Sequence, residues 1–269
     1  MRPVHLLLTV ILLAGLPSAA PAAEPPALAK ARVLYNAADY EGAIDAASVA
    51  RRLPEWSDAA ALVLARSHLE RYRRNANPAD LSAAREALGT IRAEALNARD
   101  QLDLLIGLGQ ALYLGELFGA AAELFDTALS RGSLLDPRDR LMLLDWWATA
   151  LDREAQSRPA EQRAPAFERI SARMEEELRH DAASPVASYW LAVAARGTGD
   201  VERAWDAAVA AWVRASLAPE TAEQVRADVD RLVTQALIAE RARVRPSAER
   251  REAIAALEAE WQLVKQQWK

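Results

Sequence analysis

The chain has 269 residues, of which 52% are hydrophobic and 26% charged, with 10 Gly and 13 Pro. This composition excludes a collagen-like or disordered chain and supplies enough apolar side chains for a core. Because the sequence has no cysteine, disulfides, thiolate metal sites and cysteine nucleophiles are excluded. A net charge of -5 argues against a surface that binds nucleic acid or an anionic membrane.

The first 22 residues have the pattern of a secretory signal peptide. Arg2 precedes an apolar run from Leu6 to Leu16, and Ala20-Pro21-Ala22 supplies small residues at a cleavage site. The run is shorter than the ~20 residues that span a bilayer as a helix. We therefore expect cleavage after Ala22 and export across the inner membrane to the periplasm, with no membrane span left in the mature chain. Cleavage after Ala23 and an uncleaved anchor are the alternatives.

The rest of the chain is predicted to be helical throughout. Alanine is its commonest residue, and Ala is both the best helix former and depleted in strands. No stretch alternates apolar and polar residues with the period of two that strands require. Asp136 and Ser184, each followed by Pro, are predicted N-caps. Helix boundaries are expected at the prolines Pro54, Pro78, Pro137, Pro185, Pro219 and Pro246.

Three segments repeat one spacing of small residues. In each, a small residue lies 12 positions before a central alanine, with Ala or an aromatic at +4 and Ala at +7. Small side chains at these positions let two antiparallel helices approach closely, while +4 and +7 keep the apolar stripe facing its neighbours. The pairs of small residue and central alanine are Ala31 and Ala43, Gly109 and Ala121, and Ala192 and Ala204.

This pattern resembles the tetratricopeptide repeat, a helix–turn–helix unit of about 34 residues. Two further units, with central positions near Ala84 and Ala166, fit it less closely. The resemblance implies an all-α, right-handed solenoid of about five helical hairpins over residues 23–218. Helices from Thr221 to Arg243 and from about Ser247 to the end, within residues 219–269, are predicted to cap the last repeat.

The sequence predicts a protein that is not an enzyme, with no catalytic residue, cofactor or metal site. The mature chain holds only His68 and His180, and neither belongs to a zinc-binding pattern. Phosphate-binding glycine loops and nucleophile elbows are missing from the sequence. Asp228 and Asp230 are interpreted as a solvated helix face. An enzyme on a helical solenoid, such as a wall-cleaving transglycosylase, would need a catalytic domain for which residues 219–269 are too short.

In tetratricopeptide solenoids the first helix of each hairpin lines a concave surface that holds a peptide or protein partner. The positions that match this lining are Tyr35, Asn36, Gln110, Tyr113, Tyr189 and Arg196. Some members grip a terminal carboxylate with Lys and Asn where this chain has Leu28 and Arg32. Since Leu28 offers no donor, the resemblance does not extend to that mode of recognition.

Aromatic residues mark two further features. Trp146-Trp147 and Tyr189-Trp190 are adjacent on predicted first helices, so one of each pair can enter the core while the other faces a groove or a neighbour. The alternative is that both residues of each pair serve packing between long helices. Near the C-terminus, apolar residues spaced 3 and 4 apart form a seam for one helical neighbour. This seam either caps the chain's own solenoid or pairs with another chain. Its residues are Ile254, Leu257, Trp261, Val264 and Trp268.

These features together predict an exported, non-enzymatic scaffold or adaptor of a bacterial cell envelope. It would bind a protein or peptide partner, and no nucleic acid, through the groove or the terminal helices. The alternative is an accessory subunit in the export or assembly of a cell-wall or surface polymer, a role that similar exported repeat proteins often have.

Overall fold

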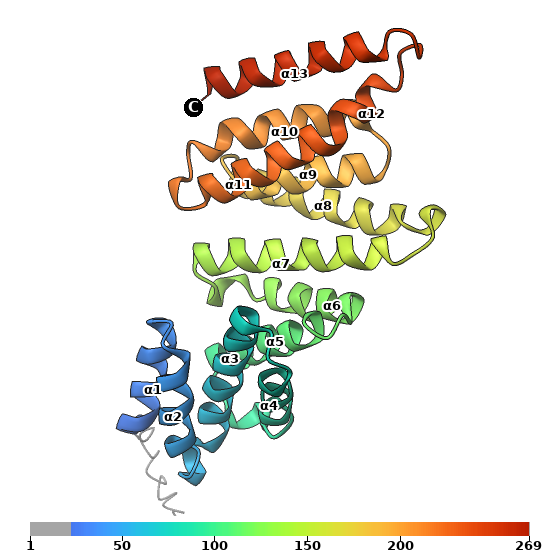
Figure 1. Cartoon of the computed structure of the whole chain (residues 1–269). Helices are drawn as coiled ribbons and strands as arrows, with labels where there is room; N and C mark the ends of the chain where they lie inside the picture. The colour runs from blue at the N-terminus through green and yellow to red at the C-terminus, as the bar shows by residue number, and fades with distance from the viewer. Residues whose placement is uncertain (1–22, 269) are drawn as a thin grey trace, which may run out of the picture.

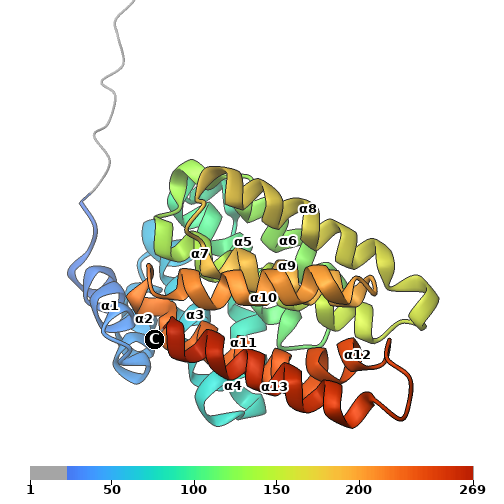
Figure 2. The same cartoon turned by 90° about the horizontal axis from the view of Figure 1, so that it is seen from above.

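A computed structural model describes residues 23–268, and the predicted signal peptide lies outside the described residues. Helices and turns make up the described part, which contains no strand. The all-α prediction is therefore confirmed. The helices follow one another in a single stack, with α1 and α2 at one end and α13 at the other (Figure 1). Seen from above, α13 lies in front of the rest of the stack (Figure 2).

Consecutive helices form antiparallel pairs. The bounds of the pairs are α1 (Pro26–Asn36) and α2 (Tyr40–Ala50), α3 (Ser57–Asn75) and α4 (Pro78–Gly89), α5 (Ala98–Tyr113) and α6 (Phe118–Leu129), α7 (Pro137–Gln156) and α8 (Ala164–His180), and α9 (Pro185–Gly197) and α10 (Val201–Ala215). The chain ends with α11 (Pro219–Leu232), α12 (Ile238–Ala242) and α13 (Arg250–Gln267).

Prolines and capping side chains begin the helices as expected. Pro78, Pro137, Pro185 and Pro219 are each the first residue of a helix, where the missing N–H costs no hydrogen bond. Asp136 Oδ1 accepts a 2.8 Å hydrogen bond from the Asp139 backbone N–H, and Ser184 Oγ accepts one of 3.3 Å from Ala187 N–H. Both predicted N-caps are confirmed.

Close helix approach explains the repeated small residues. Ala31, Ala43, Ala192 and Ala204 are fully buried, as is Ala121 in the third repeat. The repeat centred on Ala121 carries the aromatic Phe125 at +4, and its small residue is Gly109 rather than alanine. A Cβ added at Gly109 would lie 2.5 Å from Cε1 of Phe125, closer than any real contact. Where +4 is Ala, as at Ala47 and Ala208, the small position accommodates alanine.

One predicted central position is wrong. Ala166 is only half-buried at the start of α8. The buried side chains of this helix are instead Phe167, Ile170, Met174 and Glu177. Phe167 packs against Gly197 of α9, where an added Cβ would lie 2.4 Å from the Phe167 ring. In this part of the stack a glycine on the following helix, rather than a central alanine, therefore permits the close approach.

Two apolar clusters meet on α5. The N-terminal cluster includes Leu104 and Ala111, while Leu102 and Ile106 on the same helix belong to the C-terminal cluster. The C-terminal cluster continues through α10 into α11 and α13, where it ends on Trp261. The chain therefore divides at α5 into an α1–α4 part and an α6–α13 part, each packed around its own apolar cluster.

The C-terminal helices differ in detail from the expected pair. The expected helix from Thr221 to Arg243 contains a π-helical segment, Val233–Leu237, between α11 and α12. Trp261 of α13 is fully buried, 5.3 Å from the ring of Trp212 and 6.1 Å from that of Trp205 on α10. Between residues 23 and 268, no helix combines the length and apolarity needed to cross a membrane.

Candidate binding groove

The first helices of the last two pairs, α7 and α9, form a groove together with α11. Its walls come from the N-terminal turns of α7, α9 and α11, and its volume is about 930 Å³. Carboxylates and apolar side chains share the lining, with one arginine. The lining residues are Asp136, Pro137, Arg138, Asp139, Leu141, Met142, Asp145, Val186, Tyr189, Glu220, Thr221, Gln224, Val225 and Asp228.

The groove carries more carboxylates than cations. Asp139 is paired with Arg99 at 2.8 Å, and Asp228 with Arg231 at 3.0 Å. The other carboxylates of the lining make no ion pair with any of residues 23–268; they are Asp136, Asp145 and Glu220. The groove therefore presents a net negative surface, to which a cationic group would be attracted.

Two titratable side chains of the groove, Asp145 and Tyr189, are partly shielded from water by the packing of α9. Trp190 Nε1 donates a 2.8 Å hydrogen bond to Oδ1 of Asp145, which still reaches solvent through the mouth of the groove. Burial by these walls raises the pKa of Asp145, an effect that the Trp190 bond opposes and the nearby Asp228 strengthens. Burial, then Asp228 and Asp145, also raise the pKa of Tyr189. Raised pKa values of this kind indicate that water stabilises a negative charge on these side chains less than it does at an ordinary surface.

Apolar side chains occupy the middle of the groove. Met142, which is 46% exposed, lies one helical turn from both Asp139 and Asp145 on α7. Val186 of α9 and Val225 of α11 face the same space. An exposed, flexible Met at the centre of a lined groove suits an apolar side chain of a partner.

Among the predicted groove residues, Tyr189 is the one that lines this groove. Arg196 lies farther along α9, where it forms an ion pair of 2.8 Å with Glu240 of α12. Tyr113 is half-buried between Phe118 and Trp146, with ring centroids 5.3 and 5.1 Å away.

The remaining predicted groove residues lie on the N-terminal first helices. Gln110 is 6% exposed inside α5. Asn36 is exposed at the end of α1, and the Tyr35 ring lies under the Arg66 guanidinium at 4.7 Å. The predicted residues are thus distributed along the whole stack, and the structure does not bring them together at one place.

The adjacent aromatic pairs divide as predicted, since Trp147 and Trp190 are buried while Trp146 and Tyr189 are half-buried. In the C-terminal seam, Leu257 and Val264 are half-buried against the core beside Trp261, and Trp268 is 44% exposed.

Asp230, expected in solvent, accepts hydrogen bonds of 2.8 Å from Trp261 Nε1 and Lys265 Nζ. The Asp230 side chain is still 40% exposed, so it keeps contact with solvent while it also binds two side chains of α13.

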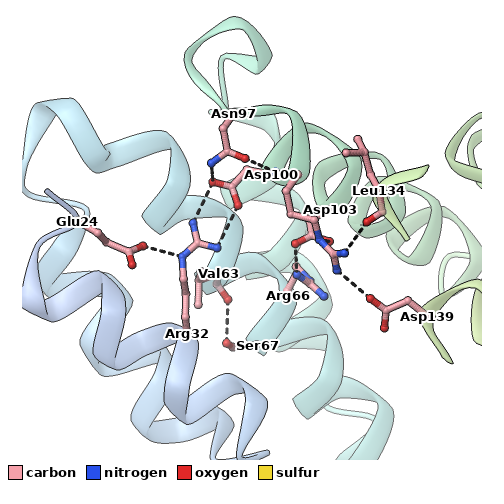
Figure 3. Close-up of polar contacts among 11 residues, drawn as sticks. Glu24, Arg32, Val63, Arg66, Ser67, Asn97, Asp100, Asp103, Leu134 and Asp139 are labelled. Carbon is pink, nitrogen blue, oxygen red and sulfur yellow. Dashed lines mark hydrogen bonds and ion pairs between the residues drawn. The ribbon is translucent and has the colours of Figure 1, made fainter. Parts of the chain in front are cut away.

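A ladder of ion pairs links the first helices α1, α3, α5 and α7 (Figure 3). Arg32 holds both carboxylate oxygens of Asp100, at 3.0 and 2.9 Å, and also Glu24 at 2.8 Å. Arg66 binds Asp103 at 2.7 Å. Arg99 of α5 then reaches Asp139 at the edge of the groove. These arginines and carboxylates of α1, α3 and α5 therefore neutralise one another, and the ladder ends at the edge of the groove.

The sequence reasoning missed the groove's main residues. Asp145 and Asp228 lie on different helices, and each alone has the pattern of a solvated surface acid. A usable signal was present in the order acid, apolar, acid at helical spacing, in Asp139, Met142 and Asp145. Only the packing of α7 beside α9 and α11 shows that these acids face one another.

No model of a known family matches this chain, and no curated protein or solved structure is similar to it at a significant level. Within residues 23–268, no group of three or more His, Cys, Asp or Glu side chains is placed to hold a metal ion. The groove itself is therefore the observation on which a function has to be based.

Proposed function

We propose that this chain is an exported, tetratricopeptide-like scaffold, without enzymatic activity, that binds a segment of another protein between α7, α9 and α11. The observation that carries the proposal is the open groove, lined by an exposed Met142 and by carboxylates with no ion pair. The groove's volume of about 930 Å³ is comparable with that of sites that hold small ligands or short peptide segments.

The repeat spacing supports the tetratricopeptide-like part of the proposal. Three hairpins bury small residues in the same phase, and two first helices, α7 and α9, line the groove together with α11, which is compatible with the resemblance. On this proposal the solenoid is right-handed and α13 closes its last repeat, with Trp261 as the buried anchor.

The periplasmic location rests on the pattern of residues 1–22. Intact-mass measurement of protein from the native host should give a chain that begins at Ala23 or Glu24. Protein that retains Met1 in the cytoplasm would contradict the proposed compartment.

Site-specific photo-cross-linking tests the binding role in the native host. A photo-reactive amino acid replaces Met142 in the groove or, as control, Val33, which is 66% exposed on α1. The proposal predicts discrete cross-linked proteins from position 142 and none from position 33. Equal cross-linking from both positions, or none from 142, would contradict a partner site in the groove.

A further inference from the structure

We infer that the groove takes an extended, cationic peptide segment in which two basic side chains flank an apolar one. This inference deepens the proposed function and rests on it, because it names the chemistry of the partner at the same site. Three observations support it. The groove has carboxylates at both ends and apolar side chains in its middle, and the ladder of ion pairs already neutralises the carboxylates on the neighbouring helices.

The carboxylates form two separate groups. Asp136, Asp139 and Glu220 lie at the N-terminal ends of α7 and α11, which run in the same direction in Figure 1. Asp145 and Asp228 lie farther along these helices and are close enough for Asp228 to raise the pKa of Asp145. Since Asp139 and Asp145 are six residues apart on α7, the two groups are ~9 Å apart along the groove.

The second group is built to receive a cation. Asp145, Asp228 and Tyr189 line the same part of the groove. Asp228 is paired with Arg231, whereas no lysine or arginine of residues 23–268 is paired with Asp145. Burial and the nearby Asp228 both disfavour the charged form of Asp145 and raise its pKa, so an incoming ammonium or guanidinium would stabilise that charge. The aromatic ring adds a face on which a cation can rest.

The middle of the groove fits an apolar side chain. Met142 lies between Asp139 and Asp145 along α7, Val225 lies between Glu220 and Asp228 along α11, and Val186 of α9 lines the same groove. An extended chain advances ~3.3 Å per residue, so ~9 Å corresponds to about three residues. The matching ligand pattern is therefore basic, apolar, any residue, basic.

The neighbouring first helices offer no competing site for such a peptide. Arg32 and Arg66 already hold Asp100 and Asp103, and Arg99 holds Asp139 from outside the groove. An acidic peptide would meet repulsion in the groove and would have to displace these internal pairs elsewhere. The distribution of charges therefore favours a positively charged peptide and favours its binding in the groove rather than on the N-terminal helices.

Fluorescence anisotropy on the full mature chain tests the inference. The probe is a labelled peptide with the core Lys-Leu-Ala-Lys between Gly-Ser flanks, compared with Glu-Leu-Ala-Glu and with Leu-Lys-Lys-Ala in the same flanks. We expect the first peptide to bind at least tenfold more tightly than the acidic one and measurably more tightly than the one with adjacent lysines. Equal affinity for the basic and acidic peptides overturns the charge preference, and equal affinity for the two basic peptides overturns the spacing.

Matched variants locate the effect. Asp145→Asn with Asp228→Asn removes two charges but keeps an oxygen that can accept the Trp190 hydrogen bond. We expect at least a tenfold loss of affinity for the Lys-Leu-Ala-Lys peptide. Asp45→Asn with Asp206→Asn removes two exposed carboxylates that make no ion pair, on α2 and α10, and should leave affinity unchanged. Equal losses in the two variants would overturn the assignment to the groove.

The two proposals fail in distinguishable ways. A partner that cross-links through position 142, and is captured equally by the Asp145→Asn, Asp228→Asn variant, contradicts the cationic segment but leaves the binding role of the groove standing. Absence of any cross-link from position 142 contradicts the binding role itself.

Discussion

In the first helices α1, α3 and α5, Arg32 and Arg66 meet Asp100 and Asp103 across the helix interfaces. In α7, α9 and α11, the carboxylates of Asp145 and Glu220 meet no cation of residues 23–268 and line an open groove. The same row of helices thus pairs these charges internally at one end. At the other end Asp139 and Asp228 are paired, while Asp145 and Glu220 stay available. An ion pair between helices contributes to stability, whereas an unpaired, desolvated carboxylate lowers it unless a ligand supplies the opposite charge.

The C-terminal half should depend most on Trp261, which holds α13 against α10 and α11. Trp261→Ala removes a fully buried indole and should lower the free energy of unfolding by ~3–5 kcal/mol, measured from urea unfolding. Trp268→Ala, at a side chain 44% exposed directly after the same helix, should cost less than about 1 kcal/mol. Equal midpoints for the two variants would show that α13 does not support the groove-bearing half.

At the junction of the two halves, Gly109→Ala should cost ~1–3 kcal/mol because its Cβ would overlap the Phe125 ring. Gly89→Ala, at a helical position with open space around it, should instead stabilise by up to ~1 kcal/mol. On a Phe125→Ala background the cost at Gly109 should disappear. If Gly109→Ala still lowers stability on the Phe125→Ala background, the overlap of its Cβ is with a group other than the Phe125 ring.

The ion-pair ladder and the groove should respond oppositely to loss of a carboxylate charge. Asp100→Asn breaks a two-point contact to Arg32 at a side chain 3% exposed, and should cost ~1–3 kcal/mol. Asp145→Asn removes a charge that has no cation partner, and should change stability by no more than about 0.5 kcal/mol. A large loss of stability at Asp145 would mean that this carboxylate serves the fold rather than a ligand.

Acidic pH should impair the groove before it unfolds the N-terminal half. Burial raises the pKa of Asp145, so this carboxylate loses its charge above the ordinary value of 3.8, and affinity for a basic peptide should fall there as pH decreases. Hydrogen bonds from Arg71 hold the pKa of Asp80 below 3.8, so its stabilisation is lost only at still lower pH. Peptide affinity and helical circular dichroism, followed together from pH 7 to pH 4, check this order. Coincident loss of both signals would contradict it.

Local chemistry made most of the fold predictable from the sequence. Prolines and caps such as Asp136 fixed the helix starts, and the small residues at Ala31, Gly109 and Ala192 revealed the close helix pairs. The groove could not be predicted in the same way, because Asp145 and Asp228 acquire their environment only from α9, which lies between them. Likewise Asp230 acquires its partners Trp261 and Lys265 from α13, more than 30 residues away in the chain.

Hydrogen-exchange protection, measured with the Lys-Leu-Ala-Lys peptide bound, tests most directly whether the two ends of the row differ in function. A peptide in the groove should slow exchange in the first turns of α7, α9 and α11, within residues 137–145, 185–190 and 219–228. Residues 26–75, whose first helices are closed by the ladder, should exchange as they do in the free protein. Protection over residues 26–75, with none over the groove helices, would contradict the assignment of the binding face.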